Sequence, residues 1–114
     1  MAGLPKPAAP PKRAKRNRKW EAAYGSEGRV QFIKRLPCAW CATTERDRHN
    51  AHLPTGAGMG QKGPYTAIVP MCWQCHDKLD GRARPRPTES EMETFWHIAA
   101  QVQADWLDHC SRNR

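Results

Sequence analysis

The chain has 114 residues, the size of a single domain, and it carries a net charge of +8 with a pI of about 9.7. Its 10 prolines, 8 glycines and mean hydropathy of −0.87 allow only a modest core, and small cores often depend on a bound metal or a disulfide. No apolar run approaches the roughly 20 residues that span a bilayer, and no signal-peptide core is present, so we expect a cytoplasmic protein that makes no membrane contact.

The positive charge is concentrated at the N-terminus. Residues 1–19 contain seven Lys or Arg and no acid, which leaves a net charge of only +1 for residues 20–114. The abundance of Pro, Ala, Lys and Arg predicts a disordered basic tail over residues 1–19. Such a tail is typical of DNA binding, although it can also serve only for solubility. The candidate phosphate contacts in it are Lys12, Arg13, Lys15 and Arg16.

Short helices and strands are predicted between residues 20 and 87. Apolar residues three or four apart predict a helix over residues 29–36, which Pro37 ends. Residues 48–53 and 66–69 predict two strands, the second ended by Pro70, and a glycine-rich loop joins them. Residues 72–79 predict a helix that stops at Gly81. These elements indicate an α+β fold.

A long helix is predicted over residues 88–110. Thr88 and Glu91 fit a capping box at its start. An apolar stripe follows at helical spacing and comprises Met92, Phe95, Trp96, Ala99, Val102 and Trp106. We expect this stripe to pack on the preceding domain, and a homodimer formed through the same face is the alternative.

Two Cys-x-x-Cys pairs are the strongest motif in the chain. Cys38 and Cys41 form the first pair, and Cys72 and Cys75 form the second. Four thiolates in two tight turns are typical of a structural zinc site, and a closed four-thiolate shell has no open position for catalysis. Two disulfides are the alternative. The fifth cysteine, Cys110, lies near the end of the predicted last helix and is expected to be an ordinary thiol.

Histidines near these cysteines suggest a second, catalytic metal. His76 and Asp80 are four residues apart on a predicted helix and can share one face, where they could hold Mg, Mn, Ni or Zn with open positions; a surface ion pair is the alternative. His52 is a candidate general base because a neutral imidazole can deprotonate water near pH 7. It could equally be structural. His49 is a further candidate ligand.

Two further groups of residues could contact phosphates. Lys62 follows the glycines of residues 56–60, where the backbone can approach an anion closely. Arg82, Arg84 and Arg86 follow the His76 helix and could track a DNA backbone. A flexible loop and solvated arginines are the alternatives.

The order of these motifs resembles the HNH endonucleases, and is most similar to small phage and prophage HNH-like proteins. The resemblance covers residues 29–81 and rests on the runs Leu-Pro-Cys-Ala-Trp-Cys, Ala-His, Gly-Ala-Gly-Met-Gly-Gln-Lys and Val-Pro-Met-Cys-Trp-Gln-Cys-His. It implies a zinc-stapled ββα-metal unit (a His-Me finger), in which a hairpin and a helix clasp one divalent ion. By this resemblance His52 is the general base, His76 is a metal ligand, and the four cysteines hold a structural zinc.

The sequence departs from the HNH pattern at three positions. Ala51 stands where the family often has a metal-binding Asp or His, Ala67 lies near the expected position of the middle Asn, and Asp80 replaces a further histidine. The resemblance implies a metal-dependent DNA endonuclease or nickase of phage or prophage origin. The alternative is a catalytically degenerate zinc-containing DNA-binding protein that assists recombination or packaging. The expected organisation is a tail over residues 1–19, an HNH-like domain over residues 20–87 and a packed helix over residues 88–110.

Overall fold

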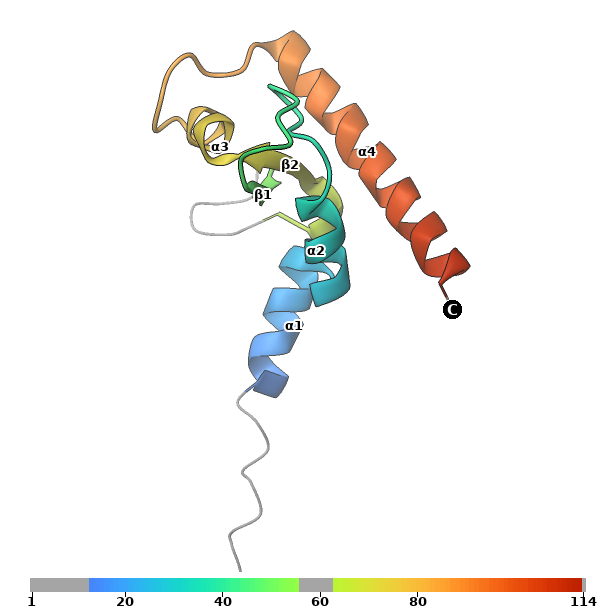
Figure 1. The fold of residues 1–114 in the computed structure, drawn as a ribbon. Coiled ribbons are helices and arrows are strands. Elements are labelled where there is room, and N and C mark those ends of the chain that lie inside the picture. The colour runs from blue at the N-terminus through green and yellow to red at the C-terminus, as the bar shows by residue number, and fades with distance from the viewer. Residues whose placement is uncertain (1–12, 56–62, 114) are drawn as a thin grey trace, which may run out of the picture.

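The computed structural model describes residues 13–55 and 63–113, which contain four α-helices, one short 3-10 helix and a two-stranded antiparallel sheet (Figure 1). The α+β class is thereby confirmed. The elements in chain order are α1 (Arg13–Tyr24), α2 (Glu27–Lys34), β1 (Arg48–His52), η1 (Tyr65–Ala67), β2 (Ile68–Cys72), α3 (Trp73–Leu79) and α4 (Glu89–Arg112).

Helix α1 corrects the prediction of a disordered tail reaching residue 19. The helix begins at Arg13, directly after the proline-rich stretch, because the residues that follow are mostly Ala, Lys, Arg and Glu, which favour helix. The rings of Trp20 and Tyr24 pack one turn apart, with centroids 5.5 Å from each other. Gly25 ends the helix with a φ of +87°, a conformation that glycine adopts without strain. Residues 1–12 lie outside the described part of the chain.

The hairpin of β1 and β2 forms the centre of the fold. The pairing runs from Arg48 opposite Cys72 to His52 opposite Ile68. The second strand was predicted over residues 66–69, but it begins at Ile68 and continues through Pro70 to Cys72. Pro70 is tolerated because it points its backbone polar groups away from β1. Its carbonyl accepts the Ala39 N–H at 2.7 Å. The nitrogen of a strand residue faces the same side as its carbonyl, so the missing N–H of Pro70 removes no hydrogen bond to β1.

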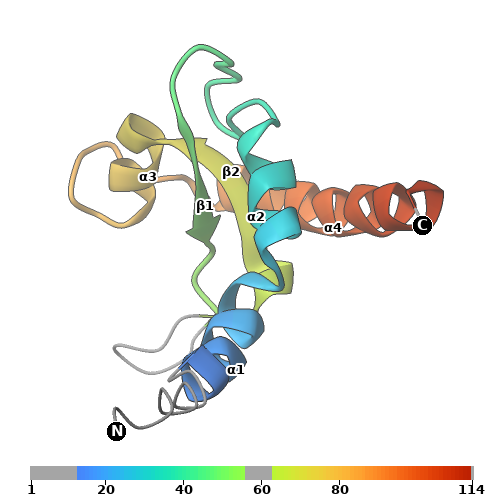
Figure 2. The same ribbon diagram turned by 60° about the horizontal axis from the view of Figure 1, so that its bottom comes forward.

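Two helices flank the hairpin. Figures 1 and 2 show α2 and α3 on opposite sides of it, so each face of β1 meets a different helix. Helix α2 begins at Glu27, two residues earlier than predicted, because the Ser26 hydroxyl accepts the Arg29 N–H and caps it. Helix α3 follows β2 directly and ends at Leu79, with Gly81 at a φ of +81° as predicted.

Helix α4 packs its apolar face on the hairpin and on α2. The predicted capping box of Thr88 and Glu91 is confirmed, since each residue's side chain accepts the other's backbone N–H. Phe95, Ala99 and Val102 are buried, but Trp96 is 40% exposed, so its predicted place in the core is wrong. Trp96 lies about 100° around the helix from Phe95 and therefore falls outside the buried stripe.

Candidate metal centre and histidine cluster

The first cysteine pair lies in a tight turn after α2. The Cys38 N–H donates to the Thr43 carbonyl and the Ala42 N–H donates to the Cys38 carbonyl, and Ala42 has a φ of 62°. The bond from the Ala39 N–H to the Pro70 carbonyl fastens this turn to β2. The second pair comes from the junction of β2 and α3, where Cys72 is the N-cap residue. The hairpin therefore carries both pairs to one place.

The four sulfur atoms fit a tetrahedral metal site. They lie within 4.8 Å of one another, and Cys41 Sγ is 3.7 Å from Cys72 Sγ. A tetrahedron with Zn–S bonds of about 2.3 Å has edges of about 3.8 Å, whereas a disulfide would bring two sulfurs to about 2.05 Å. All four are free cysteines, and Cys38, Cys72 and Cys75 are buried. The four cysteines could therefore hold a structural zinc.

Burial and hydrogen bonding give Cys72 and Cys75 different pKa values. Burial raises the pKa of Cys75 well above its usual value, and the neighbouring Cys72 and Cys38 thiols raise it further. Burial also acts to raise the pKa of Cys72, but hydrogen bonds from the Cys75 backbone and from the Cys75 and Cys41 thiols outweigh it and lower the pKa to about 7. Cys72, at the start of a helix, is thus the readier thiolate, and Cys75 ionises readily only with a cation present.

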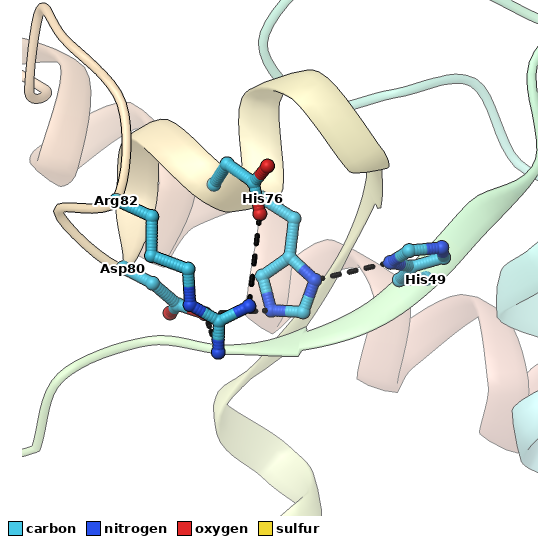
Figure 3. A network of polar contacts seen from close by, with 5 residues as sticks. His49, His76, Asp80 and Arg82 are labelled. Atoms are coloured by element: carbon cyan, nitrogen blue, oxygen red, sulfur yellow. Dashed lines mark hydrogen bonds and ion pairs between the residues drawn. The ribbon is translucent and has the colours of Figure 1, made fainter.

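A second cluster forms between β1 and α3 (Figure 3). His49 on β1 and His76 on α3 face each other with their Nδ1 atoms 3.1 Å apart and their rings edge to face. Two neighbouring ligands about 2.1 Å from one octahedral cation would be about 3.0 Å apart, so this spacing suits a shared divalent ion. The pair also suits a hydrogen bond in which one ring donates to the other.

Asp80 contacts the other nitrogen of His76. Its Oδ2 lies 3.4 Å from His76 Nε2, so the carboxylate stands behind the ring and can orient it instead of sharing a cation with Nδ1. Arg82 also reaches this carboxylate, at 3.8 Å, and it contacts Asp77 at 3.7 Å. The predicted pair of His76 and Asp80 is thus brought together, with His49 as the third member.

The surroundings of the histidine on α3 lower its pKa and so favour its neutral form. Burial lowers the pKa of His76, and although Asp80 opposes this effect, His49 and Arg82 lower the pKa further. A neutral imidazole is the form that binds a metal. Within residues 13–55 and 63–113, however, the four cysteines are the only group of three or more His, Cys, Asp or Glu whose ligand atoms all lie within 4.8 Å of one another.

His52 lies on the opposite face of β1 from His49, as the alternation of a strand requires. Its Nε2 is 2.6 Å from the Ala23 carbonyl of α1, and its ring packs edge-on against Tyr24 at 5.0 Å. An Nε2–H that donates to this carbonyl leaves the lone pair of the neutral ring on Nδ1. The contact with α1 was missed by sequence reasoning because no local pattern signals it. The separation from His49 could have been found from strand alternation.

The predicted phosphate contacts are only partly described. Lys12, Lys62 and the glycines of residues 56–60 lie outside the described residues. Arg13, Lys15 and Arg16 belong to the first turns of α1. Arg82, Arg84 and Arg86 are exposed in the loop between α3 and α4.

Ala51 and Ala67, the two positions where the sequence departs from the HNH pattern with an alanine, offer no metal-ligand atom. Ala51 is fully buried on β1 and Ala67 is buried in η1. Ala51 belongs to the main core cluster, together with Leu53, Val69 and Phe95. Both alanines therefore contribute to packing and not to metal binding.

Comparison of the chain with protein-family models, curated proteins and solved structures gives no match. Along the described residues, no helix combines the length and the apolar character needed to cross a bilayer.

Proposed function

We propose that this protein is a metal-dependent DNA endonuclease or nickase of the HNH type, in which His49 and His76 bind the catalytic divalent ion. The observation that carries the proposal is the 3.1 Å approach of the two Nδ1 atoms between a hairpin and the helix that follows it. Asp80, at 3.4 Å from His76 Nε2, supports it by orienting the ring. The four-cysteine cluster, which could hold zinc, fixes the start of α3 and with it the position of His76.

The residues divide the reaction between them. A divalent ion at His49 and His76 would stabilise negative charge on the phosphate and on the leaving oxygen. The Asp80 carboxylate, 3.4 Å from His76 Nε2, favours the tautomer with its proton on that nitrogen, which would leave the Nδ1 lone pair available to a divalent ion. His52 is the proposed general base, and its bond to the Ala23 carbonyl supports the role by fixing the tautomer with an Nδ1 lone pair.

The assignment of His52 as the base can be tested because His52 and the proposed metal ligand His49 lie on different faces of β1. A base must reach the attacking water directly or through one further water, and His49 and His52 lie on opposite faces. If His52 is the base, His52→Ala abolishes cleavage and leaves the metal affinity unchanged. Cleavage by His52→Ala at the wild-type rate would show instead that His52 is not the base.

The experiment is a plasmid-nicking assay on the full chain with added Mg, Mn, Ni or Zn. We expect the wild type to nick or linearise supercoiled DNA with at least one ion and His76→Ala to be inactive. His97→Ala is the matched control, because His97 is exposed on α4, and it should cleave normally. Asp80→Asn should weaken the ion's binding about 10- to 100-fold. Undiminished cleavage by His76→Ala would contradict the proposal.

A second candidate is a zinc-containing DNA-binding protein without catalysis. Buried Ala51 and Ala67 favour it, since both lack ligand atoms, and so do the contacts of Arg82 with Asp77 and Asp80, which engage the carboxylates beside His76. This candidate predicts a plasmid band shift that weakens steeply with salt and no strand breaks with any ion.

The contribution of the loop arginines to DNA binding can be measured separately. Replacing Arg84 and Arg86, which are both exposed, by Gln should reduce the slope of log affinity against log salt by about 2 if each contacts a phosphate. An unchanged slope would remove these two residues from the interface under either candidate function.

A further inference from the structure

A cavity of about 550 Å³ opens on the side of the molecule away from the metal-site residues. It lies where α1, α2, η1 and α4 meet, and Figure 1 shows α2 between α1 and α4 at this corner. Its wall includes Arg18, Glu21, Arg29, Tyr65, Gln103 and Trp106. We call it the Arg29 pocket. It shares no lining residue with the cysteine cluster or with the histidine cluster.

Arg29 is the unusual member of this wall. It is only 1% exposed, and among the described residues it is the only charged residue in the buried set. Its Nε and one terminal nitrogen, Nη2, donate to Gln103 Oε1 at 3.2 and 2.9 Å, and its guanidinium lies 5.1 Å from the centre of the Tyr65 ring. The other terminal nitrogen, Nη1, is buried without a hydrogen-bond partner.

No acid neutralises this guanidinium within the described residues. The ion pairs found there involve His76, Arg82 and Arg112, and none includes Arg29. A guanidinium stays charged in a protein, and a buried charge without a counter-ion is costly. Burial also lowers the pKa of Arg29, because removal from water disfavours the charged form of the guanidinium. A chain that keeps such a group beside an open cavity is suited to receive an anion there.

The remaining walls indicate the shape of the ligand. Trp106 is held in place by Phe32 and His109, whose ring centroids lie 5.4 and 5.6 Å from its own, and it gives the cavity a flat aromatic wall. The charged lining residues are Arg18, Arg29 and Glu21, so the wall carries a net charge of +1. A guanidinium matches the oxygens of a phosphate, and aromatic rings stack on bases. The volume lies in the range of small-ligand pockets, about 300–1,000 Å³.

We propose that the Arg29 pocket binds a nucleoside 5′-phosphate, with the phosphate paired to Arg29 and the base against Trp106. The same chemistry is offered by a free mononucleotide and by the phosphorylated 5′ end of a DNA strand. The proposal does not depend on nuclease activity, because binding requires neither the histidine cluster nor an added divalent ion.

The test is calorimetric titration of the full zinc-loaded chain with dAMP, deoxyadenosine and inorganic phosphate, without added divalent ion. We expect dAMP to bind at least tenfold more tightly than either fragment alone. Arg29→Met should weaken dAMP binding at least tenfold. Arg35→Met removes an exposed arginine that does not line the pocket and is the matched control, expected to bind dAMP as the wild type does.

A second pair of variants keeps the test decisive if Arg29→Met does not fold. Leu107 lines the pocket and is 57% exposed, so it tolerates substitution. Leu107→Asp should weaken dAMP binding by about threefold or more and Leu107→Lys should tighten it, because the two place opposite charges at the rim. Equal binding by both variants, or deoxyadenosine binding as tightly as dAMP, would overturn the proposal.

The source of the ligand is resolved by a second titration. A short single strand with a 5′-phosphate is compared with the same strand carrying a 5′-hydroxyl. A preference for the phosphorylated strand that Leu107→Asp reduces assigns the pocket to DNA ends. Binding of dAMP without such a preference assigns it to free nucleotides. Failure of both dAMP and the phosphorylated strand to bind would overturn the proposal, whatever the plasmid assay shows.

Discussion

Replacing Cys75 by Ala should remove the metal and unfold the hairpin unit. A structural zinc contributes about 10–16 kcal/mol of apparent binding free energy in small peptides at pH 7. A whole domain has a free energy of unfolding of only about 5–15 kcal/mol. Losing even about 4 kcal/mol would lower the melting temperature by roughly 15–30 °C in a domain of this size. Three of the four cysteines belong to the main core cluster, so loss of the metal would disturb the packing of β2 and α3 directly.

The control for this variant is Cys110→Ala, because Cys110 is an exposed free thiol on α4. We expect one zinc per chain by elemental analysis in the wild type and in Cys110→Ala, and none in Cys75→Ala. Near-UV circular dichroism should lose the signal of Trp40, whose ring lies 5.4 Å from that of Phe95 at the junction of the cysteine turn and α4. If Cys75→Ala keeps this signal and melts within about 5 °C of the wild type, the metal does not hold the fold and the reasoning fails.

Three further measurements test the same structure. Burial raises the pKa of Cys75, so its thiol must lose a proton when zinc binds. The affinity for zinc should therefore fall as the pH is lowered, and chelator competition between pH 8 and 5.5 would measure this fall. An affinity that does not change with pH would contradict the prediction. Phe95→Ala should lower the free energy of unfolding by about 3–5 kcal/mol, because Phe95 is buried. Trp96→Ala should lower it by less, because Trp96 is 40% exposed. Denaturant titration would measure both losses, and equal losses would refute the packing. Thr88→Ala should cost about 1 kcal/mol through loss of the capping bond to Glu91, whereas the exposed Ser90→Ala on the same turn should cost less.

The cysteine pairs, α3 and the start of α4 could be predicted because local rules determine them. Cys-x-x-Cys spacing requires a turn, and Gly81 supplies the positive φ that ends α3. Thr88 and Glu91 reciprocate hydrogen bonds only across the first turn of a helix. Each of these signals lies within four residues of the structure it predicts.

Other features depend on contacts that the local sequence does not carry. Pro70 was expected to end β2, but the strand continues because its carbonyl bonds to the Ala39 N–H from the cysteine turn. Trp96 was placed in the core because it is large and apolar, but the stripe of Phe95, Ala99 and Val102 leaves it on the flank of α4. Tertiary geometry decided both cases.

The histidines of the candidate site also show which features the local sequence predicts and which depend on tertiary contacts. The sequence singled out His52 and His76. The order of the motifs does not indicate on which face of β1 His52 lies, or which face of β1 packs against His76. Because side chains alternate along a strand, His49 faces α3 and contacts His76. His52 faces α1 and contacts Ala23 and Tyr24. Helix α1 includes the last residues of the segment predicted to be a disordered tail, so that segment contributes structure beside the site. Changes in α1 should therefore alter the environment of His52 while leaving the contact between His49 and His76 intact, because that contact lies on the opposite face of the strand.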